Sequence, residues 1–394
     1  MLKTCPLLPR LSVVSFTRNY TRKMSTKPPL KCPKFVPVEG GDISSRSTAD
    51  SIKFRLVSYN ILAQVYVKSS LFPHSPPSCL KWKNRSEAVL TVLKNLGADF
   101  LCLQELDHDD FYKRVMETDG YSSIYIQRSG QKRDGCGIFY KQNCCHWFSS
   151  ELLLQERIEY NDLVNSIQDE VVSCDDEQSN MLTKGNEDAP KDGSFHQNNT
   201  SKNHGDLSDP CIRLKRDCVG IMAAFRLKSP FDHVIVVANT HLYWDPKLAD
   251  VKLAQAKYLL SRLAQFKTLV SHKFKCLPSV IVAGDFNSVP NDKVYQYLVS
   301  GYSSSAQQEE ILEELPIPLC SVYAFTRGEP PFTNCTPDFT DTLDYIFFSP
   351  DSIKPVSILE LPKKDSPEVV GCLPNQYHPS DHLPIGAEFE VTKE

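Results

Sequence analysis

Five short apolar runs, widely separated along the chain, are each bordered by polar residues. The runs occupy residues 54–57, 100–103, 234–238, 280–283 and 345–348. They are rich in β-branched and aromatic residues, which is typical of strands buried on both faces of a sheet. Because the polar residues stand at the ends of such strands, we expect them to gather at one rim. The sequence therefore predicts a sheet protein with a polar site at that rim.

The polar residues at these strand ends are of the types that bind metals, contact phosphate and transfer protons. They lie in the segments Ser58-Tyr59-Asn60, Gln104-Glu105, Asn239-Thr240-His241, Gly284-Asp285-Phe286-Asn287, Leu343-Asp344-Tyr345 and Ser380-Asp381-His382. A single Asp or His after a strand is most often a cap or a surface residue. Their recurrence at every strand end favours one shared site instead.

The carboxylates suggest a metal ligand and a base. Glu105 is the candidate ligand, because a carboxylate beside the buried run 100–103 is poorly compensated without a partner. Magnesium takes oxygen ligands and is typically held by one or two carboxylates together with substrate phosphate. Asp285 can orient or deprotonate an attacking water, and Asn287 can donate to a phosphate oxygen from the same face if the strand continues. Gly284 allows close backbone approach.

Two histidines, His241 and His382, are candidate cationic donors. Phosphoryl transfer places negative charge on the equatorial and leaving oxygens, so its catalysis needs donors aimed at both. An acidic neighbour is needed to keep a histidine protonated near neutral pH, and Asp344 or Asp381 can raise the pKa by charge attraction. A zinc site is the weaker alternative, because no Cys-x-x-Cys motif occurs.

Longer motifs around these residues carry a resemblance to a known family. The motifs are SYNILA (58–63), LQE (103–105), KRDGCG (132–137), THLYWDP (240–246), GDFNS (284–288), LDYIF (343–347) and SDHLP (380–384). In this order they resemble the endonuclease/exonuclease/phosphatase superfamily. Within it they are similar to the carbon catabolite repressor-type deadenylases and their nocturnin-like and Angel-like relatives.

The resemblance implies an α/β (α+β) fold of the deoxyribonuclease-I type, a two-layer β-sandwich of mixed sheets flanked by helices. Periodicity agrees with it: apolar stripes over 85–96 and 250–266 predict two amphipathic helices, and alternation over 385–391 predicts a final half-buried strand. The length of 394 residues allows one large core. We therefore expect a single catalytic domain at 51–394.

The resemblance also implies roles for the residues that bind metal and phosphate. It assigns Glu105 to Mg²⁺, with Mn²⁺ as the alternative cation. Asp381 is assigned either to a second ion or to support of the site. Asn60 and Asn287 are placed beside the scissile phosphate, and Asp285 is assigned to the nucleophilic water.

The same pattern implies roles for charge and for base binding. His241 and His382 are assigned to transition-state charge, with Asp344 orienting His382. Pro246 and Phe339 stand at positions similar to those that sandwich an adenine base. The alternatives are a helix-start proline at 246 and core packing at 339.

The net charge, apolar runs and cysteines of the chain limit which partners and which cell compartment are expected. A net charge of −4 disfavours a tight nonspecific nucleic-acid binder, whereas an exonuclease that holds a few terminal nucleotides needs fewer basic residues. No membrane span is expected, because the chain has no apolar run of roughly eighteen residues. The irregular spacing of its 14 cysteines favours reduced thiols in an intracellular protein, so cytoplasm and/or nucleus is expected.

Two segments differ from the catalytic pattern. Residues 1–23 are basic, rich in Ser and Thr and free of acidic residues, which suits a mitochondrial or plastid transit peptide; Met24 offers a second start. The alternative for residues 1–30 is a disordered basic tail. Residues 162–210 are acidic and poor in aromatics, so we expect a disordered insertion within the catalytic domain.

Three functions fit this sequence. The first is a magnesium-dependent 3′–5′ exoribonuclease that degrades poly(A) tails of RNA to 5′-AMP in mRNA turnover. The second uses the same machinery on a small phosphoester, such as a dinucleotide 2′-phosphate or an RNA terminal phosphate. The third, a catalytically inactive RNA-binding scaffold, is disfavoured by the complete catalytic set. The chain shows no leucine-rich repeats, so membership of a larger deadenylase complex stays open.

Overall fold

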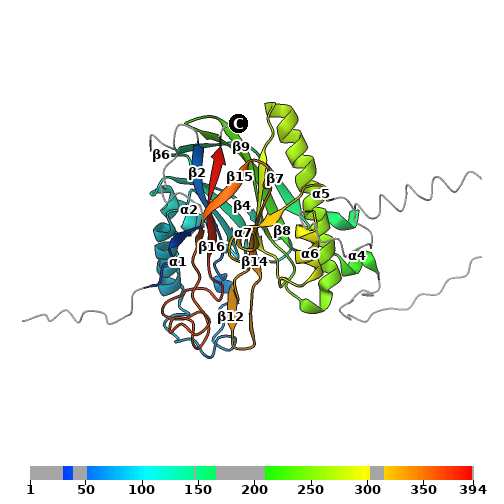
Figure 1. The fold of residues 1–394 in the computed structure, drawn as a ribbon. Helices are drawn as coiled ribbons and strands as arrows, with labels where there is room; N and C mark the ends of the chain where they lie inside the picture. Colours follow the sequence, from blue (N-terminus) through cyan, green and yellow to red (C-terminus); the bar gives the residue numbers. More distant parts are fainter. Residues whose placement is uncertain (1–29, 39–50, 146–147, 166–208, 302–314, 393–394) are drawn as a thin grey trace, which may run out of the picture.

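Two seven-stranded mixed sheets pack face to face (Figure 1). The computed structural model describes residues 30–38, 51–145, 148–165, 209–301 and 315–392. The first sheet has the order β1 (Phe35–Pro37), β15 (Ile353–Leu359), β16 (Ile385–Thr392), β2 (Ser51–Asn60), β3 (Phe100–Gln104), β5 (Gly135–Lys141) and β4 (Tyr121–Gln127). The second has the order β11 (Cys320–Ser321), β14 (Asp344–Phe348), β10 (Ser279–Asp285), β9 (His233–His241), β8 (Val219–Lys228), β7 (Phe148–Glu159) and β6 (Asn143–Cys145). This architecture confirms the predicted sandwich.

Helices cover the outer faces of the sandwich. On the first sheet lie α1 (Trp82–Leu96) and α2 (Asp109–Glu117), and on the second lie α5 (Ala249–Phe274) and α6 (Lys293–Val299). Shorter elements are α4 (Pro210–Arg213), α7 (Val322–Thr326), the 3₁₀ turns η1 (Gln64–Tyr66) and η2 (Pro246–Leu248), and the hairpin β12 (Asn334–Thr336) and β13 (Phe339–Asp341). Both predicted helices are present. The second extends beyond residue 266, because Val270 is also buried against the sheet.

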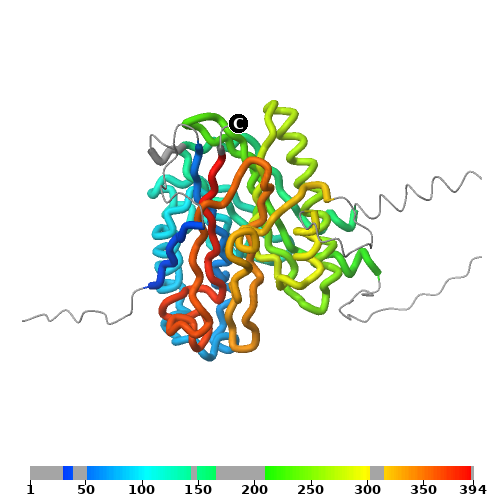
Figure 2. The backbone as a smooth tube through the Cα atoms, in the orientation of Figure 1, coloured from blue at the N-terminus to red at the C-terminus, as the bar shows by residue number. Residues whose placement is uncertain are grey.

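The core between the sheets is built largely from aromatic and β-branched side chains. Phe54 and Phe389 stack at 5.5 Å between ring centroids, and Phe225 lies against Phe100 at 5.0 Å. Segments from opposite ends of the sequence lie side by side, since β2 pairs with β16 (Figure 2). The prediction of a half-buried β16 is wrong in part, because Glu388 is buried as well and accepts a hydrogen bond from Arg55.

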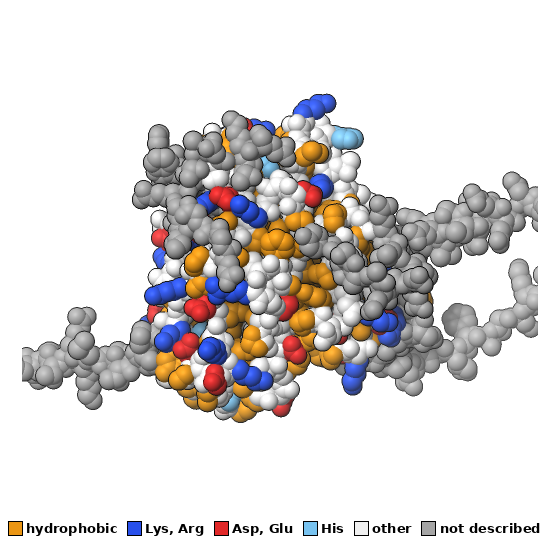
Figure 3. Space-filling view, in the orientation of Figure 1, with side chains coloured by type: hydrophobic (Ala, Val, Ile, Leu, Met, Phe, Trp, Pro, Cys, Tyr) orange, Lys and Arg blue, Asp and Glu red, His pale blue; other side chains and the backbone are white. Residues whose placement is uncertain are grey.

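The predicted tail and insertion fall largely outside the described residues, which exclude 1–29 and 166–208. At the near edge of the predicted insertion, Leu163 and Val164 are buried. None of the helices in the described ranges is both long and apolar enough to cross a membrane. Basic and acidic side chains are interspersed on the described part of the face in Figure 3, in keeping with the small net charge.

The half-buried carboxyl group of Asp99 gives a stability prediction. Burial raises its pKa from 3.8 to about 6, although the carboxylate accepts a hydrogen bond from the Arg55 main-chain N–H. The folded state therefore holds this proton more tightly than the unfolded state, and stability is lost as the pH rises through about 6. Asp99→Asn should stabilise the fold by roughly 1 to 3 kcal/mol at pH 8 and give no gain near pH 4.

Thermal melts of the wild type and Asp99→Asn across this pH range would measure the effect. The exposed Asp351 provides the control, since Asp351→Asn should change the melting temperature little at either pH. A gain that did not depend on pH would contradict the assignment to Asp99 ionisation.

Candidate active site

The polar strand ends meet at one rim, at the end of the sandwich where β12 is labelled in Figure 1. Parallel pairing of β2 with β3 places Asn60 opposite Gln104. Parallel pairing of β9 with β10 places His241 opposite Asp285 in the other sheet. Antiparallel β14 adds Asp344, whose register partner is Asp285. The rim arises because parallel neighbours end at the same edge of a sheet.

Asp285 is the centre of this site. One carboxylate oxygen accepts from the main-chain N–H of Asn287 at 2.9 Å. The other accepts from Nδ2 of Asn60 at 3.0 Å and lies 3.5 Å and 3.7 Å from Nε2 of His241 and His382. Burial raises the pKa of Asp285, and the two histidines oppose that rise. A carboxylate whose pKa lies above its usual value suits a general base.

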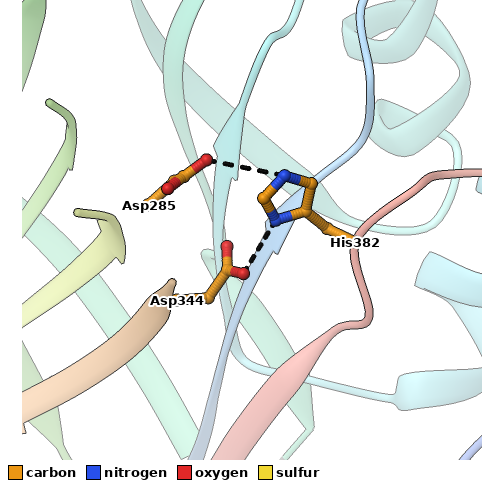
Figure 4. Close-up of side chains that lie close together, drawn as sticks. All are labelled: Asp285, Asp344 and His382. Atoms are coloured by element: carbon orange, nitrogen blue, oxygen red, sulfur yellow. Dashed lines mark hydrogen bonds and ion pairs between the residues drawn. The ribbon is translucent and has the colours of Figure 1, made fainter. Parts of the chain in front are cut away.

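His382 is held by Asp344, as Figure 4 shows. Its Nδ1 lies 2.8 Å from Oδ2 of Asp344, which also accepts a 2.6 Å hydrogen bond from the hydroxyl of Thr333. Burial lowers the pKa of His382, but attraction to Asp344 and Asp285 outweighs burial and raises the pKa well above its usual value. His382 is therefore an imidazolium near neutral pH. Its contact with Asp344 is the one that the sequence predicts.

His241 differs from His382 in charge. It is also buried and lies near Asp285, but burial outweighs that attraction and lowers its pKa to about 4. The expectation of a positive charge on His241 is therefore not met in this arrangement. A neutral imidazole still offers one N–H donor to a substrate oxygen.

Glu105 follows β3 with a left-handed backbone, φ 54°. Its Oε1 accepts from Nδ2 of Asn60 at 3.0 Å, and its Oε2 accepts from the main-chain N–H of Ala63 at 2.9 Å. Burial and repulsion by Asp381 raise the pKa of Glu105 to about 7. Two carboxylates that repel each other at a partly buried site fit a hard divalent cation.

A second group of potential ligands is Asp285, Asp344 and His382, whose ligand atoms all lie within 4.8 Å of one another. Both ring nitrogens of His382 already face carboxylates. A protonated imidazole has no free lone pair for a metal. In this protonation state His382 is hydrogen-bonded to Asp344 and ion-paired with Asp285, and Glu105 with Asp381 is the better candidate cation site.

The turn after β10 differs from the expected continuous strand. The strand ends at Asp285, and Asn287 adopts a left-handed backbone with φ 47°. Its Nδ2 donates to the main-chain oxygen of Leu242 at 3.0 Å. Gly284 permits the close approach of two strands, because a Cβ there would lie 2.1 Å from the oxygen of Thr240. The sequence predicts a shared face for Asp285 and Asn287 only if the strand continues, and that condition is not met because the strand ends at Asp285.

Some supporting residues were not expected in these roles. The hydroxyl of Thr333 donates to the Asp344 carboxylate and accepts from the Asp344 main-chain N–H at 3.1 Å, but a threonine just before a hairpin gives no such signal in sequence. Behind the site, Nε2 of Gln104 donates to Oδ1 of Asn239 at 2.8 Å and so joins the two sheets. Both amides stand out as polar residues in apolar strands, but the sequence does not pair them.

The two predicted base-binding residues are both accessible. Phe339 is 42% exposed on β13, so the alternative of core packing is wrong. Its hairpin lies beside the site, because Asn334 forms a β-bridge with His382. Pro246 is exposed at the first position of η2, where it also serves as a helix-start proline.

The rim of the two-sheet sandwich brings together Asp285, His382 and two carboxylates that repel each other, a set of groups that suits phosphoester hydrolysis. A family profile described as the endonuclease/exonuclease/phosphatase family matches residues 57–151 and 228–382. The chain belongs to this family. Together with the relatives below, that membership makes it an enzyme of the nuclease and phosphodiesterase class.

Individual relatives agree with this assignment. Carbon catabolite repressor protein 4 homolog 4 of Arabidopsis thaliana is 57% identical over 426 residues, which cover 98% of both chains. The CCR4-Not complex 3′-5′-exoribonuclease subunit Ccr4 of Schizosaccharomyces pombe is 26% identical over 393 residues, covering 88% of this chain. The match covers 50% of that relative, so the chain spans about half its length.

Solved structures also match. ANGEL2, a 2′,3′-cyclic phosphatase in complex with adenosine-2′,3′-vanadate, has a TM-score of 0.65 and 26% identity, with 92% of this chain and 99% of that chain covered. The human Nocturnin catalytic domain with bound sulfate has a TM-score of 0.56 and 21% identity, covering 91% and 98%. At this identity Nocturnin shows the fold alone.

The position of Asp285 predicts the effect of removing its charge. Asp285→Asn keeps the side-chain shape and can still accept from Asn60, but it cannot take a proton from water. We expect turnover to fall by about 10² to 10⁴ with KM little changed, the usual range for a general base. Steady-state kinetics with a melting curve would measure both. A rise in KM with turnover intact would instead make Asp285 a binding residue.

Proposed function

We propose that this enzyme is a metal-dependent 3′–5′ exoribonuclease that removes adenylate residues from RNA tails as 5′-AMP. The observation that carries the proposal is the exposed ring of Phe339, on a hairpin bridged to the segment of His382. An aromatic ring left open to solvent beside a hydrolytic site suits stacking on a nucleic-acid base. The similarity to proteins named as 3′-5′-exoribonucleases supports the same substrate class.

Each residue of the site contributes to hydrolysis. Glu105 and Asp381 would hold Mg²⁺, which when bound neutralises negative charge on the scissile phosphate. Asp285 takes the proton of the attacking water. His382 donates its Nε2–H to a phosphate oxygen, while Asp344 keeps the ring protonated and oriented. His241 offers a neutral N–H to the same group.

A small phosphoester is the second candidate substrate. It is favoured by the structural similarity to ANGEL2, described as a 2′,3′-cyclic phosphatase. Labelled oligo(A), oligo(U), RNA with a terminal phosphate and a set of phosphorylated nucleotides, each with and without Mg²⁺, would separate the two. Shortening of oligo(A) to 5′-AMP supports the exonuclease, whereas release of phosphate from ends or nucleotides alone supports the alternative.

Removal of the metal carboxylate should abolish activity. Glu105→Gln keeps the size of the side chain but removes its charge, so we expect hydrolysis to be lost at ordinary Mg²⁺ concentrations. Folding should persist, because the side chain lies at the rim and its raised pKa means that its charge costs stability. Melting curves and activity over a Mg²⁺ titration test both. Activity that survived chelation or the substitution would exclude this role.

Base stacking gives a prediction specific to the RNA substrate. Phe339→Ala should weaken oligo(A) processing by roughly 1 to 3 kcal/mol, about 5- to 150-fold, while a small phosphodiester is hydrolysed as before. The control is Phe325→Ala, because Phe325 is similarly exposed, at 47%, but lies on α7 against Phe348. Equal losses on both substrates, or a lowered melting temperature without change in oligo(A) rate, would exclude a stacking role.

A further inference from the structure

A buried arginine on α1 is held by neutral groups alone. Arg85 is 3% exposed, and no carboxylate lies within ion-pair distance of it among the described residues. Its guanidinium instead donates four hydrogen bonds of 2.6–2.9 Å. The acceptors are the main-chain oxygens of Ile61, Leu62 and Pro379 and the side-chain Oε1 of Gln64.

These acceptors belong to the two loops that carry catalytic groups of the first sheet. Ile61 and Leu62 directly follow Asn60, and the N–H of Leu62 donates to Oδ1 of Asn60 at 3.0 Å. Pro379 precedes Ser380, whose hydroxyl donates to the main-chain oxygen of Asn60 at 2.7 Å. The same hydroxyl accepts from the N–H of His382 at 3.2 Å. Arg85 therefore ties the Asn60 loop to the His382 loop.

A buried lysine occupies a comparable position on the other side of the sandwich. Lys252, in the first turns of α5, is 3% exposed, and its Nζ donates to the main-chain oxygen of Asn287 at 2.5 Å. Its nearest carboxylate is Asp292 at 3.9 Å. One turn later on α5, Oε1 of Gln255 accepts from the N–H of Tyr243 at 2.9 Å, in the loop after β9.

Burying a charge is costly unless hydrogen bonds and nearby charges compensate it. Packing alone would be served as well by an apolar side chain at either position. The two cations instead saturate carbonyl groups of the loops around the site. Carboxylates of the site also stabilise the two positive charges, because Asp381 attracts Arg85 and Asp285 attracts Lys252.

We propose that Arg85 and Lys252 are positioning residues of the active site. Each is a buried cation on an outer helix that fixes the backbone of loops carrying catalytic groups. Arg85 sets the relative position of Asn60 and His382, and Lys252 sets the turn that holds Asn287 against Asp285. The inference rests on the proposed hydrolytic function, since positioning acts through those groups.

The test compares kinetics with stability in matched variants. Arg85→Ala, Arg85→Lys and Lys252→Met remove the contacts, while Lys83→Met and Lys257→Met change exposed lysines on the same two helices. A small displacement of catalytic groups can cost about 10²-fold, so we expect kcat to fall about 10- to 100-fold in the first group. KM for a small phosphodiester should stay within about twofold, because the contacts position catalytic groups and not the substrate. The exposed controls should match the wild type.

Chemical rescue separates positioning from general stability. Low millimolar guanidinium chloride should restore part of the kcat of Arg85→Ala, because the ion can occupy the space of the missing side chain and donate to the same carbonyl groups. It should not restore Asp285→Asn. Arg85→Lys should remain impaired, since an ammonium lacks the planar fork that reaches both loops.

Several results would overturn the inference. Arg85 and Lys252 variants that keep wild-type kcat below their melting temperatures would make both residues purely structural. So would a fall in kcat of the same size in the exposed controls. If Arg85→Ala does not fold, Arg85→Lys and Lys252→Met decide the question by the same kcat and KM criteria. If the wild type itself hydrolyses none of the substrates, the proposed function is wrong. If the wild type is active and the Arg85 and Lys252 variants have the same kcat, only the inference about these two residues is wrong.

Discussion

The site depends on one buried amide that joins the two sheets. Nδ2 of Asn60, the last residue of β2, donates to Glu105, which directly follows β3 of the same sheet, and to Asp285 in the other sheet, at 3.0 Å in each case. The candidate metal carboxylate and the candidate base thus share one donor group, so their separation is set by how the sheets pack. The Gln104–Asn239 hydrogen bond behind the site fixes that packing with a second polar contact in an otherwise apolar core.

Charge balance explains why the two buried histidines differ. Carboxylates gathered in a medium of low polarity repel one another, and each needs a donor or a cation. His382 lies between Asp344 and Asp285, and two carboxylates outweigh the cost of burying an imidazolium. His241 is attracted mainly by Asp285 and less by Asp217, whereas burial, Arg128 and His382 oppose protonation, and it stays neutral. One residue therefore supplies charge and the other supplies only a hydrogen bond.

The sequence predicted the strands, the rim and the Asp344–His382 contact, because burial patterns are local and the motifs are specific. It did not predict the left-handed turn at Asn287 or the neutral state of His241. Those depend on close packing of β9 against β10 and on burial, which are set by residues distant in sequence. The sequence also did not predict the proposed role of Arg85. The apolar stripe of α1 indicates that this residue faces inward, but it does not indicate that the guanidinium donates hydrogen bonds to two loops distant in sequence.

Preference for adenine would require more than the exposed ring of Phe339. Stacking tolerates any base, so selectivity must come from hydrogen bonds to the base edge. Asn287 donates one amide hydrogen to the main-chain oxygen of Leu242. Among the described residues its other side-chain N–H and its side-chain carbonyl oxygen have no partner, so both can contact substrate. The remaining N–H can serve the phosphate or a base acceptor, but not both at once. If it binds the phosphate, the oxygen is left to accept from the adenine amino group, whereas uracil could donate to that oxygen only from its ring N3–H, which stands at a different position on the base edge.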